Sequence, residues 1–146
     1  MYIAIDFDGT IADHKFPKIG DSVPGAFEWI RKFKEADATL ILWTMRSDTP
    51  KSGAALTDAL AFCEENGITF DLVNENPQDW TTSNKVFADI YIDNSAFGCP
   101  LRENPRTGGR PVVDWEKIGP TVMEKLEAHQ RRKERLKAMH GTFHGL

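Results

Sequence analysis

Five polar residues stand where predicted β-strands begin or end, and their types could carry out chemistry together. Two acids follow the first apolar segment, a threonine follows the second, and a lysine and an acid flank a later one: Asp6, Asp8, Thr44, Lys85 and Asp93. In open parallel sheets, ligands bind in the crevice outside the carboxyl ends of the strands. We therefore expect these side chains to converge at one site, although the sequence scatters them.

The two acids of the first turn have complementary uses. A carboxylate can attack phosphorus and form an aspartyl-phosphate, which divides a difficult displacement into two easier steps. Asp6 is the candidate for this nucleophile. Asp8, two residues later, could protonate the leaving alkoxide and then deprotonate the water that hydrolyses the intermediate. The alternative is a pair of solvated acids in an Asp-Gly turn, which is common turn chemistry.

Carboxylates crowded around a phosphate would repel one another unless cations offset their charge. Mg²⁺ prefers oxygen ligands and commonly uses one or two carboxylates, for which Asp6 and Asp93 are suited. Lys85 would supply a positive charge to the nucleophile and the phosphoryl group, and Lys51 is the alternative lysine. The Thr44 hydroxyl would bond a phosphoryl oxygen. Arg46 could bind a substrate phosphate through its two-pronged guanidinium.

The order of these motifs resembles the haloacid dehalogenase superfamily. The segments in question are D-F-D-G-T after the first strand, L-I-L-W-T, a later lysine and I-Y-I-D-N, and together they span about two thirds of the chain. The second acid of the first motif is similar to the phosphatase and phosphomutase branches. The resemblance implies a three-layer α/β/α Rossmann-like sandwich, and Mg²⁺ coordinated by Asp6, the backbone carbonyl of Asp8, and Asp93.

The last motif departs from the usual pattern of that superfamily, in which a further acid lies close by. Here Asn94 follows Asp93, and Ala96 and Phe97 supply no carboxylate. The Asn94 amide can still contact a metal through its oxygen or through a coordinated water. Because an amide carries no charge, we expect a lower metal affinity, and a lower activity with it.

The hydrophobic pattern alternates strands and helices, which predicts an α/β protein with a mainly parallel sheet. A helix opens at Pro24 and a short helical turn is expected around Lys85. The other predicted strands are 2–6, 39–44, 69–73, 89–93 and a short one at 111–113, and the other predicted helices are 52–66 and 115–139. A long surface loop is expected from Ser95 to Arg110.

The 146 residues fit a single domain, and no gap between motifs has room for a large cap. Residues 11–23 can form only a flap, and residues 44–85 are taken up by one helix, one strand and their loops. An uncapped site suits a phosphate displayed on a macromolecule or a nucleotide, or a lid from another subunit. The substrate and the oligomeric state stay open.

The composition indicates a globular protein, with 40% apolar and 27% charged residues and a net charge of -4. The start of the chain lacks a signal-peptide pattern, and no apolar run approaches the roughly 20 residues that cross a bilayer. These features predict a cytoplasmic protein with no membrane partner. The net charge disfavours general nucleic-acid binding. A basic helix from Lys125 to Lys137 could contact nucleic acid, although a solvated face is the simpler interpretation.

The main hypothesis is a Mg²⁺-dependent phosphomonoesterase, and two alternatives stay open. A signalling receiver domain also combines acids, threonine, lysine and magnesium, but there the lysine comes last, whereas here Asp93 follows Lys85. A binding or scaffold protein with the same fold and weakened catalysis is suggested by Asn94 and by the basic helix. Turnover of an aryl phosphate, compared between the wild type and Asp6→Asn, would separate the phosphatase from the scaffold.

Overall fold

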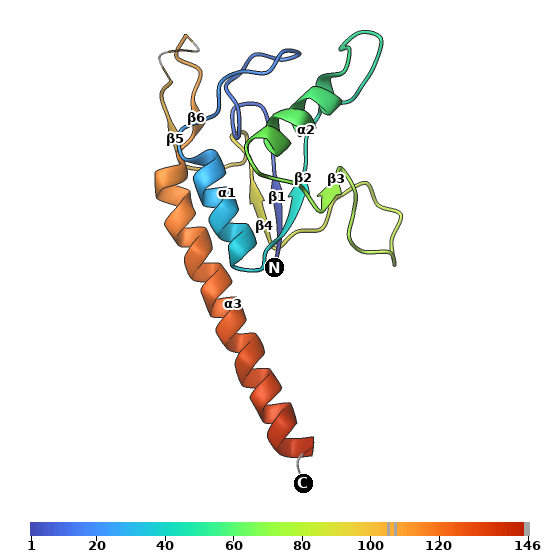
Figure 1. The fold of residues 1–146 in the computed structure, drawn as a ribbon, viewed down its shortest axis with the longest axis vertical. Helices are drawn as coiled ribbons and strands as arrows, with labels where there is room; N and C mark the ends of the chain where they lie inside the picture. The colour runs from blue at the N-terminus through green and yellow to red at the C-terminus, as the bar shows by residue number, and fades with distance from the viewer. Residues whose placement is uncertain (105, 107, 145–146) are drawn as a thin grey trace.

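The computed structural model describes residues 1–104, 106 and 108–144, and its centre is a four-stranded parallel sheet in the order β3-β2-β1-β4 (Figure 1). The strands are β1 (Tyr2–Ile5), β2 (Thr39–Leu42), β3 (Leu72–Val73) and β4 (Ile90–Ile92). The predicted α/β class with parallel strands is confirmed. β3 begins later than predicted because the Asp71 carboxylate, rather than a backbone carbonyl, accepts the Leu40 N–H at 2.8 Å.

The register of the sheet aligns the carboxyl ends of its strands. Ile5 pairs with Leu42 on one side and with Ile92 on the other, and Leu42 pairs with Val73. The first residue after β1 continues this pattern, since the Asp6 amide donates to the Ile92 carbonyl at 2.9 Å. The residues that follow the four strands therefore share one edge of the sheet, as the sequence predicts.

Three helices of the described residues pack on one face of the sheet. They are α1 (Ala26–Glu35), α2 (Ala55–Glu65) and α3 (Trp115–His144). Each contributes to one core cluster with Ile3, Ile5 and Leu42. On α1 the buried residues recur at helical spacing, with Phe27, Ile30 and Phe33 among them.

The opposite face of the sheet is covered differently from the expected three-layer sandwich. A small cluster of Ala4, Ile41 and Val86 lies there, and the covering segment 74–89 contains no helix. The helical turn expected around Lys85 is therefore wrong. Local side-chain bonds explain this, because Asn76 accepts the Gln78 amide and Ser83 accepts the Lys85 amide. Such bonds compete with the helical hydrogen bonds of the same backbone.

The expected surface loop after β4 contains a short hairpin. Its strands, β5 (Leu101–Arg102) and β6 (Val112–Val113), pair antiparallel. β6 is anchored to the acidic turn, because the Val113 amide donates to the Gly9 carbonyl at 3.0 Å. Two residues after it, the buried Trp115 indole donates to the Thr10 carbonyl at 2.7 Å. The hairpin thus supports the turn that follows β1.

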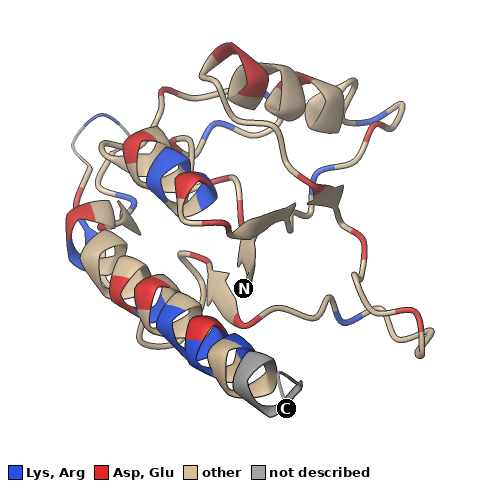
Figure 2. Ribbon diagram, turned by 60° about the horizontal axis from the view of Figure 1, so that its bottom comes forward, with Lys and Arg blue, Asp and Glu red and all other residues tan. Residues whose placement is uncertain are grey.

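The last helix, α3, has two unlike halves. Trp115, Val122 and Leu126 are buried, whereas every residue from 131 to 140 is exposed and the helix extends past the sheet (Figure 1). This half is mainly basic, with five Lys and Arg residues and the single acid Glu134 between residues 131 and 140, and basic segments predominate along it in Figure 2. None of the helices among the described residues combines the length and the apolar character that crossing a bilayer requires.

Candidate active site

The turn after β1 holds Asp6 and Asp8 at the carboxyl edge of the sheet. The amides of Ile11 and Ala12 both donate to the Phe7 carbonyl, at 2.8 and 3.1 Å. The Phe7 ring is completely buried in the core on the helix side. Because side chains alternate along an extended backbone, Asp6 and Asp8 turn away from that core.

Gly9 is required by the shape of this turn. Its φ of 79° lies in the left-handed region that disfavours side chains. A Cβ at this position would also overlap the His14 ring and crowd the Asn94 amide. The glycine of the first motif therefore lets the chain pass closely under Asn94, which brings the first and last motifs together.

Asp6 is held by a threonine that the sequence reasoning overlooked. The Thr10 hydroxyl is completely buried and lies 3.0 Å from Oδ2 of Asp6, to which it can donate. The hydroxyl oxygen of Thr10 in turn accepts the backbone N–H of Asn94 at 3.1 Å. Thr10 is the last residue of D-F-D-G-T, so its place in that motif was the available signal.

Burial raises the pKa of Asp6 from 3.8 to about 7, and the negative charge of Asp93 adds to the effect. The hydrogen bond from Thr10 opposes the rise without cancelling it. No lysine or arginine forms an ion pair with Asp6 or Asp93 in the part of the chain that the structure describes. The two carboxylates therefore share a site that lacks a neutralising side chain.

The Asn94 side chain is directed into the centre of this acidic site. One end of its amide lies 2.9 Å from Asp6 Oδ2, 3.1 Å from the Asp8 carbonyl oxygen and 3.3 Å from Asp93 Oδ1. With Nδ2 at that end, the amide donates to all three oxygens. With Oδ1 there, the amide adds a fourth oxygen to the cluster and can accept from Thr10 at 3.3 Å.

These oxygens fit a small divalent cation. Mg²⁺ binds oxygen octahedrally at about 2.1 Å, which places neighbouring ligand oxygens about 3 Å apart. Within the described residues, no three His, Cys, Asp or Glu side chains are grouped to hold a metal ion. A cation would depend on the carboxylates of Asp6 and Asp93, the Asp8 carbonyl and the Asn94 amide oxygen. The structure brings together these four predicted residues.

The Asp8 carboxylate forms a bidentate ion pair with Arg46. Nε and Nη2 of Arg46 donate to the two Asp8 oxygens at 2.9 and 2.8 Å. The arginine side chain is 1% exposed and the aspartate side chain 24%. Asp8 thus has a fixed orientation and a neutralising charge behind it, while part of its carboxylate faces solvent.

The prediction that Arg46 binds a substrate phosphate is wrong. Its remaining N–H groups donate to backbone carbonyls of Pro17, Lys18 and Ala55 at 2.7 to 3.0 Å. All five guanidinium donors are therefore used inside the protein. Arg46 instead ties the flap and the start of α2 to Asp8, a burial that spacing alone could not reveal.

Thr44 lies two residues beyond β2, at the same edge as Asp6. Its hydroxyl oxygen accepts the Arg46 amide at 3.1 Å, and its own amide donates to the Asn74 side chain at 2.8 Å. Asn74, which follows β3 with a φ of 51°, was not singled out from the sequence. The hydroxyl hydrogen of Thr44 makes none of these bonds, so it can be donated outward.

Neither candidate lysine joins the site through any described contact. Lys85 lies in the covering segment 74–89 and lines a hollow with Trp80 and Tyr91 on the other side of the molecule from the helices. Lys51 is exposed in the loop before α2. The prediction that Lys85 faces Asp6 fails because no helix follows β3 to carry this segment back to the carboxyl edge.

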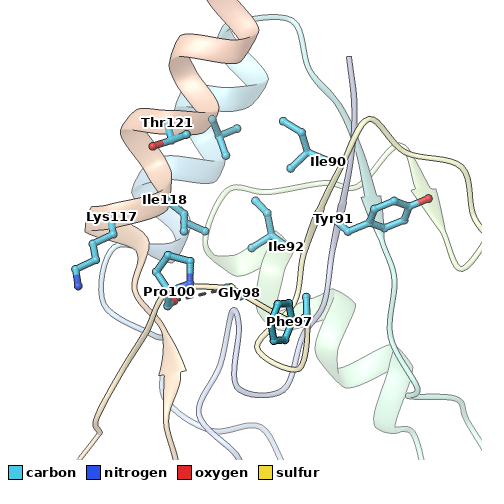
Figure 3. Close-up of a pocket in the computed structure, with 12 residues that line it drawn as sticks. Ile90, Tyr91, Ile92, Phe97, Gly98, Pro100, Lys117, Ile118 and Thr121 are labelled. Atoms are coloured by element: carbon cyan, nitrogen blue, oxygen red, sulfur yellow. Dashed lines mark hydrogen bonds between the residues drawn. The ribbon is translucent and has the colours of Figure 1, made fainter.

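Two hollows lie near the site and differ in character. One, of about 600 Å³, borders Asp8 and is lined by the flap, the residues after β2, and Arg110. The other, of about 310 Å³, lies between β4 and α3 and is mainly apolar, with Ile92, Pro100 and Ile118 in its wall (Figure 3). Only the first borders a residue of the acidic turn.

The fold and the site define a Rossmann-like α/β protein with an acidic cluster at the carboxyl edge of a parallel sheet. No family model and no curated protein matches the chain. Among solved structures, a conserved protein from Bacteroides thetaiotaomicron is similar, with a TM-score of 0.67 and 34% identity over 86% of this chain and 91% of that one. The chain belongs to the same family as that protein. This match shows the family and the fold.

Proposed function

We propose that the protein is a Mg²⁺-dependent phosphomonoesterase of the haloacid dehalogenase type, which works through an aspartyl-phosphate on Asp6. The observation that carries this proposal is that an Asp6 oxygen, the Asp8 carbonyl oxygen and an Asp93 oxygen all lie 2.9 to 3.3 Å from one atom of the Asn94 amide. Such a cluster of oxygens at the carboxyl edge of a parallel sheet is where this chemistry requires a cation and a nucleophile.

The protein's own residues would divide the work as follows. Thr10 holds Oδ2 of Asp6, which leaves Oδ1 to attack phosphorus. The Thr44 hydroxyl donates to a phosphoryl oxygen. When bound, Mg²⁺ would offset the negative charges of the carboxylates and the phosphoryl group. Because no lysine pairs with Asp6 in the described residues, more of this negative charge would have to be offset by the cation than the sequence predicts.

Asp8 serves both half-reactions. In the first, the bond from Asp6 Oδ1 to phosphorus forms, the ester P–O bond breaks, and Asp8 gives a proton to the leaving oxygen. In the second, Asp8 takes a proton from the water that attacks phosphorus, and the Asp6 carboxylate is released. Each Asp8 oxygen accepts one bond from Arg46, which orients the carboxyl group for both proton transfers.

The test is hydrolysis of an aryl phosphate with Mg²⁺ by the wild type, by Asp6→Asn and by Asp79→Asn, an exposed acid in the covering segment. We expect turnover in the wild type and in Asp79→Asn and none above background in Asp6→Asn, with all three equally folded by circular dichroism. Chelation should abolish turnover, and added Mg²⁺ should restore it. Full activity of Asp6→Asn would exclude this mechanism.

A second candidate is a binding protein that keeps the fold with weakened catalysis. Two observations favour it: no lysine among the described residues pairs with Asp6, and the ion pair with Arg46 holds Asp8 in place. This candidate predicts that Mg²⁺ binds and raises the melting temperature in the wild type, and less so in Asp93→Asn, while no phosphoester is turned over. Turnover abolished by Asp6→Asn would rule it out.

A further inference from the structure

The hollow beside Asp8 lies where the leaving group of a substrate would be. It is bounded by the flap residues His14, Lys15 and Phe16, by Met45 after β2, and by Arg110. In the proposed reaction Asp8 gives its proton to the oxygen that leaves. Whatever is attached to that oxygen must therefore lie on the Asp8 side, in this hollow.

The charge of the hollow favours an anion. Lys15 and Arg110 are exposed and come from segments almost a hundred residues apart in the chain. The acid that borders the hollow, Asp8, is neutralised by Arg46. His14 contributes no negative charge, and its Nε2 lies 3.0 Å from the Pro111 carbonyl oxygen. The lining therefore carries a positive balance, to which a second negative group on a substrate would be attracted.

The hollow also has an apolar wall open to solvent. Met45 is 98% exposed and Phe16 is 56% exposed, although both are large apolar side chains. The Phe16 ring lies 5.2 Å from the Arg46 guanidinium carbon, which fixes one side of the wall. Covering such surface with an apolar group is favourable, and aromatic groups contribute most area.

We propose that this hollow selects phosphomonoesters whose leaving group has a planar apolar part and a second anionic group, either a carboxylate or a phosphate. The inference rests on the proposed phosphatase function and adds the substrate class. Lys15 and Arg110 bind the second anion, and Met45 and Phe16 cover the apolar part.

The experiment compares the kcat/KM of three substrates with Mg²⁺: phenyl phosphate, 4-carboxyphenyl phosphate and 1,4-phenylene bisphosphate. We expect the wild type to prefer either anionic substrate over phenyl phosphate by about tenfold, and the two arms show which anion is favoured. Each exposed ion pair contributes a few-fold. The preference should fall to about threefold in Lys15→Gln or Arg110→Gln and vanish in the double variant, but persist in Lys133→Gln on the exposed half of α3.

A separate variant tests the apolar wall. Met45→Ala should lower the preference of the enzyme for phenyl phosphate over glycerol phosphate by a few-fold. Equal kcat/KM values for phenyl and 4-carboxyphenyl phosphate in the wild type, or a preference that survives in the Lys15→Gln/Arg110→Gln double variant, would overturn the inference while leaving the phosphatase intact.

A binding measurement distinguishes failure of the proposed function from failure of the assignment of the hollow. Calorimetry with phenylphosphonate and 4-carboxyphenylphosphonate in Mg²⁺ needs no turnover. If no ester is hydrolysed but the carboxylated compound binds more tightly by about tenfold, and the double variant loses the difference, the hollow is assigned correctly and the phosphatase proposal fails. Equal binding of the two compounds overturns the assignment of the hollow.

Discussion

Asp6 and Asp8 leave the same turn, two residues apart, yet the protein treats them in opposite ways. Asp8 is matched by a buried arginine that donates to both of its oxygens. Asp6 faces Asp93 instead, and burial with this like charge raises its pKa to about 7. The protein thus pairs one acid with a buried basic side chain, whereas no lysine or arginine among the described residues forms an ion pair with the other. The difference explains why two acids at close spacing can have separate roles.

The largest expected effect tests the role of Asp8 as acid and base. Asp8→Asn should lower kcat for glycerol phosphate by roughly 10² to 10⁴, because its leaving alkoxide needs a proton. The loss for 4-nitrophenyl phosphate should be at least tenfold smaller, because nitrophenolate leaves without one. Steady-state kinetics with both substrates measures the split. An equal loss on both would show that Asp8 acts only by holding the turn.

The next effect concerns the ion pair behind Asp8. Arg46→Met removes the buried cation and leaves Asp8 and three backbone carbonyls without their donor, so unfolding in urea should become easier by about 3 to 5 kcal/mol. Adding Asp8→Asn should recover part of that loss, because the unpaired charge is gone. Arg132→Met, at an exposed position on α3, is the control and should change little. Additive effects of the two site changes would contradict a direct pair.

A third test uses pH and the other acid. With a chelator present, Asp6 keeps its proton up to about pH 7 in the folded protein, whereas the unfolded chain loses it near 3.8. Between these values the unfolded state binds fewer protons, so stability falls as pH rises, by roughly 4 kcal/mol in all. Below pH 3.8 this contribution is fully present.

Comparison with Asp6→Asn isolates this contribution from the other titrating groups. The difference in unfolding free energy between the wild type and the variant, measured by urea titration from pH 4 to 8, should change with the stated sign. Asp48, whose pKa is lowered by bonds from Thr57, titrates equally in both proteins. A flat difference across this range would mean that Asp6 is not buried beside a like charge.

Much of the fold could be predicted because it depends on local patterns. The buried runs of β1 and β2 and the helical spacing of Phe27, Ile30 and Phe33 are properties of short segments. The segment after β3 was harder, since its strand is only two residues long and Asn76 and Ser83 bind their own backbone. A helix and such a self-bonded segment can carry similar composition.

The site residues likewise differ in how far local sequence could predict them. Asp6 and Asp93 directly follow β1 and β4, and Asp8 and Asn94 come within two residues of these acids, so the register of the sheet brings all four together once the strands are known. Arg46 was misassigned because its partners come from three other segments, and only the folded chain shows all five donors occupied. Lys85 was misassigned because its place depended on a helix that does not form.

The smallest expected effect concerns the two lysines that the sequence offered as partners of Asp6. Lys85→Gln should change kcat/KM for an aryl phosphate by less than about twofold, because Lys85 lines a hollow with Trp80 and Tyr91 rather than the acidic site. Lys51→Gln, in the exposed loop before α2, should behave alike. The apparent affinity for Mg²⁺ is the more sensitive measurement, since a lysine near Asp6 would compete with the cation for the same negative charge. A large drop in kcat with Lys85→Gln alone would mean that segment 74–89 moves to the site during catalysis, and that Asp6 is neutralised by the protein as Asp8 is.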